Sequence, residues 1–143
     1  MAIDGGLRNL LGNRLITYGV HWQAIETGST GRGVPDANGC FDGVEFWVEC
    51  KKCEGNALQI APEQVAWHMR RWRAGGNTYI AVRRKCSKGL RRTAKDELWL
   101  FSGQDVQTLK KDGLNAKIPV LGKWARGPSK WDWERVRDIL IGK

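Results

Sequence analysis

Two acidic residues and a lysine lie near each other in the sequence, at a spacing that suits metal-assisted chemistry. Asp36 and Glu49 belong to two strand-like segments, residues 34–41 and 44–52, and Lys51 follows Glu49 by two positions. The tight hairpin expected between these segments places Asp36 across from Glu49, with Lys51 on the same face of the sheet. Like charges in opposite positions are destabilising. A cation between the two carboxylates would reverse the sign of that interaction.

This group of side chains suits the hydrolysis of a phosphodiester. Mg²⁺ prefers oxygen ligands, takes one or two carboxylates, and completes its shell with water and substrate phosphate. The bound cation polarises a phosphoryl oxygen and lowers the pKa of its water, while an adjacent lysine orients or activates that water. We therefore expect Mg²⁺ as the cofactor, with Mn²⁺ able to replace it. The sequence leaves open whether one or two ions bind.

The surrounding elements predict a mixed α/β fold that holds this hairpin. The Asp42-Gly43 pair is a strong turn signal, and Phe46 and Val48 alternate with the acidic residues, which places them on a core-facing side. Pro62 suits the first position of a helix whose stripe of Val65, Met69 and Trp72 faces the core. The predicted elements are a helix over 7–18, a strand over 21–27, a glycine-rich loop over 28–33, the two hairpin strands, a helix over 62–74, strands over 78–83 and 97–101, a helix over 105–111, and a C-terminal helix over about 130–141 with Ser129 as cap and Asp132 three residues on.

Composition indicates one folded domain with a polyanionic partner. The chain has 143 residues, 41% of them hydrophobic, and a formal charge of +9. We expect a single domain over 1–143, with a basic, acid-free segment over 83–95. The N-terminus carries no secretory signal, and no apolar run approaches the roughly 20 residues of a membrane span. A cytoplasmic location without membrane contact is the expectation.

The segment Val34-Pro35-Asp36, followed after residues 37–48 by Glu49-Cys50-Lys51, resembles the motif of the PD-(D/E)XK nuclease superfamily. The run of residues 31–36, the hairpin, the downstream helix with Gln64 and the Gly75-Gly76 stop are similar to VRR-NUC and Holliday-junction-resolvase-like nucleases, small phage-type endonucleases in particular. The likeness covers roughly residues 20–84. It implies a restriction-endonuclease-like core, a mixed central sheet flanked by helices in α-β-β-β-α-β order. For a phage-encoded member, the location would be the host cytoplasm.

The resemblance also implies roles for individual residues. Asp36 and Glu49 would be metal ligands with the backbone carbonyl of Cys50, Lys51 would be the catalytic lysine, and Gln64 would lie near the active site. Many members supply a further acid from the first helix, but residues 7–18 contain none. Glu26 is the substitute that we expect as catalytic residue and metal ligand. Each assignment has an alternative. Asp36, Glu49 and Lys51 could form a surface ion-pair cluster. Gln64 could be a solvent-facing helix residue, and Glu26 could be a surface charge.

The sequence predicts a metal-dependent DNA endonuclease, and the resemblance implies branched DNA as the first substrate to test and a homodimer as the assembly. Basic residues near the motif are expected to contact DNA phosphates, against the alternative of a solvated loop. They are Arg32, Lys52, Arg70, Arg71, Arg73, Arg83, Arg84, Lys85, Lys88, Arg91 and Arg92.

Two other functions stay open at the level of sequence. One is a non-catalytic nucleic-acid-binding module that keeps a nuclease-like fold. The other is a zinc-stabilised binding protein that uses Cys40, Cys50, Cys53 and Cys86, although strand alternation points Cys40 and Cys50 to opposite faces. His21 and His68 appear without partners at metal-ligand spacing. Most tryptophans are expected in the core, namely Trp67, Trp72, Trp99, Trp131 and Trp133, while Trp47 is expected to pack under the first helix.

Overall fold

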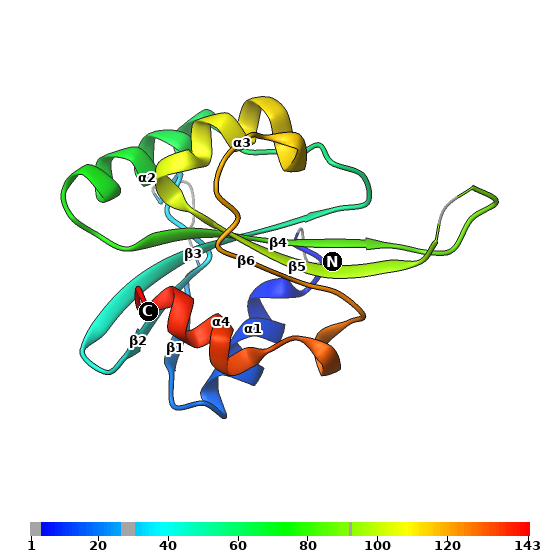
Figure 1. Ribbon diagram of the computed structural model, residues 1–143. Coiled ribbons are helices and arrows are strands. Elements are labelled where there is room, and N and C mark those ends of the chain that lie inside the picture. Colours follow the sequence, from blue (N-terminus) through cyan, green and yellow to red (C-terminus); the bar gives the residue numbers. More distant parts are fainter. Residues whose placement is uncertain (1–3, 27–30, 92) are drawn as a thin grey trace.

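The computed structural model describes residues 4–26, 31–91 and 93–143, which form one six-stranded sheet with helices on both faces (Figure 1). The elements are α1 (Leu7–Ile16), β1 (His21–Ala24), β2 (Ala37–Phe41), β3 (Val44–Cys53), α2 (Pro62–Arg73), β4 (Thr78–Cys86), β5 (Lys95–Ser102), α3 (Val106–Asp112), β6 (Gly122–Trp124) and α4 (Trp133–Leu140), with 3-10 helices at Gly103–Asp105, Gly113–Asn115 and Pro128–Lys130. The strands follow chain order across the sheet. β3 and β4 are parallel, and all other neighbouring pairs are antiparallel. The prediction of a mixed α/β sheet flanked by helices is confirmed.

The hairpin forms in the register that the sequence predicts, but β2 begins at Ala37 instead of residue 34, so Asp36 lies just outside the ladder and is not paired with Glu49 in it. Phe41 lies opposite Val44 at the turn, and the antiparallel pairing continues without a bulge to Ala37. Asp42 and Gly43 have φ angles of 52° and 77°, the backbone of the tight turn that an Asp-Gly pair favours. The register therefore fixes which side chains of β3 face the core and which face the candidate site.

α2 connects β3 to its parallel neighbour β4 and covers the face of the sheet that carries Glu49 and Lys51. Pro62 is its first residue, where the fixed φ of proline suits a helix start. Gly33, in the loop before β2, has a φ of +84° and lies so close to the first turn of α2 that an added Cβ would meet the carbonyl oxygen of Glu63. This close approach brings the segment with Asp36 against the start of α2.

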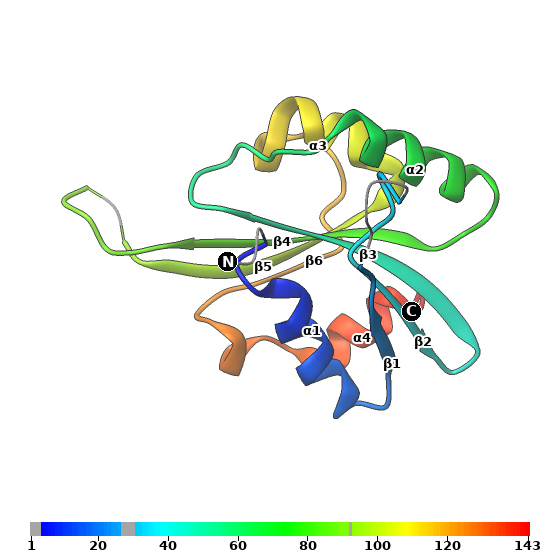
Figure 2. The ribbon, with the colours of Figure 1, turned by 180° about the vertical axis from the view of Figure 1, so that it is seen from behind.

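Two apolar layers lie on opposite faces of the sheet. On one face, α1 and α4 pack over Phe46 and Val48 of β3, both fully buried. On the other face, α2 and α3 pack over Ile80 of β4 and Phe101 of β5. Figure 2 shows the same two layers from behind. The candidate site lies where β3, which has partners on both sides, meets both helical layers.

β4 and β5 extend beyond the rest of the sheet as a two-stranded arm (Figures 1 and 2). The sequence prediction ended the first of these strands at residue 83, which is too short. Arg84 lies opposite Glu97, and their side chains are 2.6 Å apart, while Arg83 makes two hydrogen bonds of 2.8 Å with Asp96. Because these charges neutralise each other across the ladder, residues 83–86 of the basic segment continue as strand, while Lys88 and Arg91 lie in the connection to β5.

Other differences from the sequence prediction are local. The short edge strand β6 was not predicted. Asp132, rather than Ser129, caps α4 by accepting a hydrogen bond from a backbone N–H. Trp72 is 42% exposed because it lies in the last turn of α2, beyond the residues that pack on the sheet. Trp47 packs against Trp67 of α2 rather than under α1. Within the described ranges, no helix is both long and apolar enough to cross a membrane.

Candidate metal centre

The candidate acids lie where β2 separates from β3. The ladder ends at the pair Ala37 and Val48, so Asp36 is the first residue beyond it. The Oδ2 atom of Asp36 accepts a hydrogen bond of 2.7 Å from the backbone N–H of Cys50. Because the N–H and C=O of one residue in a strand face the same edge, the carbonyl of Cys50 faces this gap as well. The expected backbone ligand and the expected carboxylate therefore point to one opening.

Glu49 is 2% exposed, and its carboxyl group lies within hydrogen-bond reach of Asp36 when one of the two is protonated. Burial, this hydrogen bond and the charge of Glu49 raise the pKa of Asp36 to about 8. Burial also raises the pKa of Glu49, although Asp36 and Lys51 oppose that shift. Two carboxylates this close ionise together only at a cost. A divalent cation removes that cost.

Lys51 and Gln64 are held in one hydrogen-bonded group with Glu49. The Nζ atom of Lys51 donates to Oε1 of Gln64 at 2.8 Å and lies 3.9 Å from Oε2 of Glu49. Gln64 also donates from Nε2 to Oε2 of Glu49 at 3.3 Å. Its Oε1 accepts a second hydrogen bond from the backbone N–H of Ala61 at the start of α2. The structure thus brings Gln64 into contact with both candidate catalytic side chains.

A third carboxylate joins the group from the segment before α1. The carboxylates of Asp4 and Asp36 and the thiol sulfur of Cys50 lie within 4.8 Å of one another, whereas Glu49 reaches this group through Asp36. The charge of Asp4 contributes to the raised pKa values of Asp36 and Glu49. Asp4 is oriented by α1, since its carboxylate accepts hydrogen bonds of 2.9 and 3.0 Å from two backbone N–H groups at the start of that helix.

Asp4 occupies the place for which the sequence prediction chose Glu26. The side chain of Glu26 is 85% exposed and pairs with Arg8 at 3.6 Å. Glu26 is therefore a surface charge, which is the alternative that the sequence left open. Asp4 precedes the helix over 7–18 in which the further acid was expected, so the sequence prediction did not include it. An aspartate just ahead of a helix is a preferred capping residue, and that signal was available in the sequence.

The variant Asp4→Asn separates the role of Asp4 in the metal centre from its role as a cap. Asparagine keeps only one of the two oxygens that accept backbone hydrogen bonds, so we expect a loss of stability of about 1 kcal/mol that leaves the protein folded. The loss of one negative charge should weaken Mn²⁺ binding about tenfold or more in calorimetric titrations. Glu26→Gln is the matched control and should bind like the wild type. Equal affinities for Asp4→Asn and the wild type would exclude Asp4 from the centre.

His68, one helical turn after Gln64, is a further residue at the site that sequence analysis missed. It is fully buried, and its Nε2 lies 4.0 Å from Oε1 of Glu49. Burial and the charge of Lys51 lower the pKa of His68 to about 4, so the ring is neutral. The spacing of four residues from Gln64 was the available signal, because it places both side chains on one face of the helix.

The oxygen atoms present fit a hard divalent cation. Oε1 of Glu49 is buried and, with both carboxyl groups ionised, accepts no hydrogen bond from any residue that the structure describes. A buried carboxylate oxygen without a partner is costly unless a cation or donor meets it. Asp36 and the Cys50 carbonyl offer further oxygens at the same gap, and the carboxylate of Asp4 lies within 4.8 Å of that of Asp36. This ligand set is of the kind that Mg²⁺ prefers.

The thiols do not fit the zinc alternative. Burial and the neighbouring carboxylates raise the pKa of Cys50 well above its usual value, so it holds its proton, whereas zinc requires a thiolate. Across residues 4–26, 31–91 and 93–143, no second cysteine joins the group of clustered ligand atoms. Cys50 packs in the core, as the strand pattern predicted.

The basic residues expected on DNA fall into two sets. Arg83 and Arg84 are engaged by acids of β5, and Arg71 lies over the rings of Trp47 and Trp67, 5.3 and 4.7 Å from their centroids. Arg92 lies outside the described residues. The remaining members are exposed, and they are Arg32, Lys52, Arg70, Arg73, Lys85, Lys88 and Arg91.

Comparisons with protein-family models and with curated proteins found no match for this chain. The likeness to nucleases therefore rests on the residues themselves and on their geometry.

Proposed function

We propose that the chain is a Mg²⁺-dependent DNA endonuclease of the PD-(D/E)XK class. The observation that carries this proposal is the meeting of Asp36, Glu49 and Lys51 at one gap in the sheet, with a buried oxygen of Glu49 that lacks a donor among the described residues. The strand order and the α2 crossover are consistent with a restriction-endonuclease-like core of the VRR-NUC or Holliday-junction-resolvase-like branch. Branched DNA as substrate and a homodimeric assembly belong to the same proposal.

In this proposal the chain supplies the ligands and positions the water. Asp36, Glu49 and the Cys50 carbonyl hold the metal, and Asp4 adds a third carboxylate. When bound, Mg²⁺ supplies charge that polarises a phosphoryl oxygen and acidifies water; Mn²⁺ would serve as well. Lys51 then orients and activates the attacking water from the protein side.

Gln64 and His68 are positioning residues in this proposal. Gln64 bridges Lys51 and Glu49 and is itself fixed by the backbone of Ala61. Its two hydrogen bonds set the distance between the ligand and the lysine. The neutral ring of His68 closes the buried side of Glu49 and excludes water there. Both residues would keep the carboxylate in one orientation while DNA binds.

The charge distribution supports DNA as the polyanion. The formal charge of the chain is +9, and this count already includes the acids that pair with Arg83 and Arg84. Exposed cations remain near the proposed centre and along the arm, including Lys88 and Arg91. Contacts of this kind bind phosphates with little sequence information and weaken steeply as salt rises.

Cleavage assays with supercoiled plasmid and a four-way junction test the proposal. We expect the wild type to cut DNA with Mg²⁺ and not with EDTA, and Glu49→Ala to lose about 10³-fold or more in rate, because it removes a metal ligand. The variant should still bind DNA at low salt. Glu134→Ala, which removes an exposed carboxylate on α4, is the matched control and should cut normally. A wild type that cuts neither DNA with Mg²⁺ or Mn²⁺, or an equally active Glu49→Ala, would refute the enzyme and favour a binding module.

A further inference from the structure

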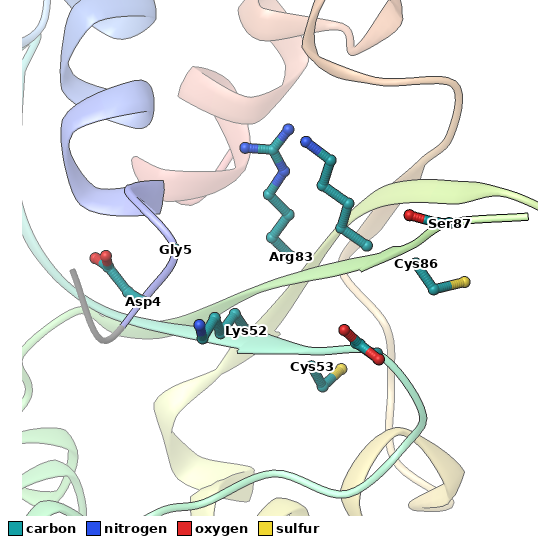
Figure 3. A pocket seen from close by; sticks show the side chains of 9 residues that line it. Asp4, Gly5, Lys52, Cys53, Arg83, Cys86 and Ser87 are labelled. Carbon is teal, nitrogen blue, oxygen red and sulfur yellow. The ribbon is translucent and has the colours of Figure 1, made fainter. Parts of the chain in front are cut away.

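A cleft of about 500 Å³ adjoins the proposed metal centre, between the start of α1 and the strands β3 and β4 (Figure 3). Asp4 belongs both to its wall and to the clustered ligand atoms of the metal centre. The cleft therefore meets the proposed metal centre at Asp4, while Lys52, Arg83 and Lys85 lie on the face of the sheet opposite Glu49 and Lys51. Its volume lies within the range of small-ligand sites.

Three basic side chains from two neighbouring strands line this cleft. Lys52 of β3 lies beside Arg83 of β4 in the parallel register, and Lys85 follows on the same face of β4. Arg83 is neutralised by Asp96. Lys52 and Lys85 are exposed, and in the part of the chain that the structure describes neither amine has an ion pair or side-chain hydrogen bond.

The stem of Lys52 is confined by the segment that carries Asp4. A Cβ added to Gly5 would come within 3.2 Å of Cδ of Lys52, and Gly5 has a positive φ of 66°. The lysine chain thus packs against backbone while its amine stays in the cleft (Figure 3). A lysine whose stem is held in this way loses less side-chain entropy when it binds an anion.

We propose that this cleft binds the DNA phosphate next to the scissile one on the cleaved strand, between the amines of Lys52 and Lys85. The proposal rests on the nuclease function and adds a substrate requirement, namely that the strand must extend beyond the cut on the side of the cleft. The metal centre would receive the scissile phosphate, and the two amines would receive the next one. Together they match the two phosphates that flank one nucleotide. Lysine binds phosphate as a point charge, so the site needs no particular base.

Calorimetric titration with thymidine 3′,5′-bisphosphate and with each thymidine monophosphate, in Mg²⁺, tests the cleft directly. In the wild type the bisphosphate should bind at least about tenfold more tightly than the better monophosphate, because a second phosphate gains charge-assisted contacts. In the double variant Lys52→Gln/Lys85→Gln that advantage should fall to about twofold or less. Lys117→Gln, another exposed lysine, should keep it.

Unchanged monophosphate binding by the double variant shows that it is folded. A bisphosphate advantage that is absent in the wild type, or that survives in the double variant, would overturn the proposed cleft. These results are separate from those of the nuclease proposal. DNA cutting without a bisphosphate advantage removes the cleft and keeps the nuclease. A lysine-dependent advantage without cutting removes the nuclease and leaves the cleft as a phosphate-binding site only.

Discussion

Asp36→Asn should abolish DNA cutting and yet make the metal-free protein more stable at pH 8.5. The wild-type carboxyl group is buried, lies beside Glu49 and Asp4, and has its pKa raised to about 8. Asparagine keeps the shape and can still accept the hydrogen bond from Cys50, but it carries no charge. Cutting should fall about 10³-fold or more, because one metal ligand becomes a neutral amide.

The stability effect has a definite pH range. In the unfolded chain Asp36 loses its proton near its ordinary pKa of 3.8, whereas in the fold it keeps the proton up to about pH 8. The folded state therefore binds more protons between these limits, and the stability of the metal-free wild type falls with pH there, by up to about 1.4 kcal/mol per pH unit from this group. Asp36→Asn removes this dependence. Its Tm should exceed that of the wild type by roughly 10 °C or more at pH 8.5 and by much less at pH 5.

Added Mg²⁺ should reverse the order of the two proteins. The wild type gains stability from a ligand that binds only the folded state, and at pH 8.5 metal binding does not have to displace the proton of Asp36. Asp36→Asn should show little increase in Tm with Mg²⁺. Thermal melts of both proteins at pH 5 and pH 8.5, each with Mg²⁺ or with EDTA, measure the Tm in all eight combinations. If metal-free Asp36→Asn is less stable than the wild type at pH 8.5, the ionised carboxylate stabilises the fold. That result would contradict the proposed repulsion between Asp36 and its acidic neighbours.

Lys51→Gln should lose cutting by about 10²–10⁴-fold while it keeps metal and DNA binding. Lys51 donates a hydrogen bond to Gln64 and lies 3.9 Å from Glu49, and in the proposed function its removal would take away the orientation and activation of water without removing a metal ligand. Mn²⁺ affinity should stay equal or rise, because a positive charge near the ligands disappears. This pattern is the opposite of the one expected for Asp36→Asn, which loses the metal itself.

Single-turnover rates and Mn²⁺ titrations of Lys51→Gln, with Lys117→Gln as control, separate the two effects. Gln64→Ala should lose less rate than Lys51→Gln, because it removes only the support of the lysine. A Lys51→Gln that cuts at the wild-type rate would assign the activation of water to another group. A Lys51→Gln variant that loses Mn²⁺ binding would show that Lys51 supports the metal ligands instead of activating water.

Local signals carried most of what the sequence predicted correctly. The Asp42-Gly43 turn fixed the register of the hairpin, and the register placed Glu49 and Lys51 on the face opposite the core. Pro62 marked the start of α2, and the contact of Gln64 with the catalytic group follows from that start. Each of these features depends on residues that are close together in the chain.

The features that the sequence did not reveal depend on contacts between distant segments. Asp4 and Asp36 meet only because α1 packs across β3, and no spacing in the chain reports that packing. The arm of β4 and β5 continues because Arg84 pairs with Glu97 across the ladder, so the first residues of a basic run that is typical of a loop form a strand. A pattern read along one segment cannot detect a partner that another segment supplies.

The claim on which the other proposals depend is that Asp36, Glu49 and the Cys50 carbonyl hold a divalent cation together. Anomalous diffraction from crystals of the wild type grown with Mn²⁺ tests it most directly. We expect a strong anomalous peak in the gap beside β3, about 2.0–2.3 Å from oxygens of Asp36 and Glu49 and from the Cys50 carbonyl. Crystals at saturating Mn²⁺ that show no peak in that gap, or a peak only on other residues, would contradict the proposed centre.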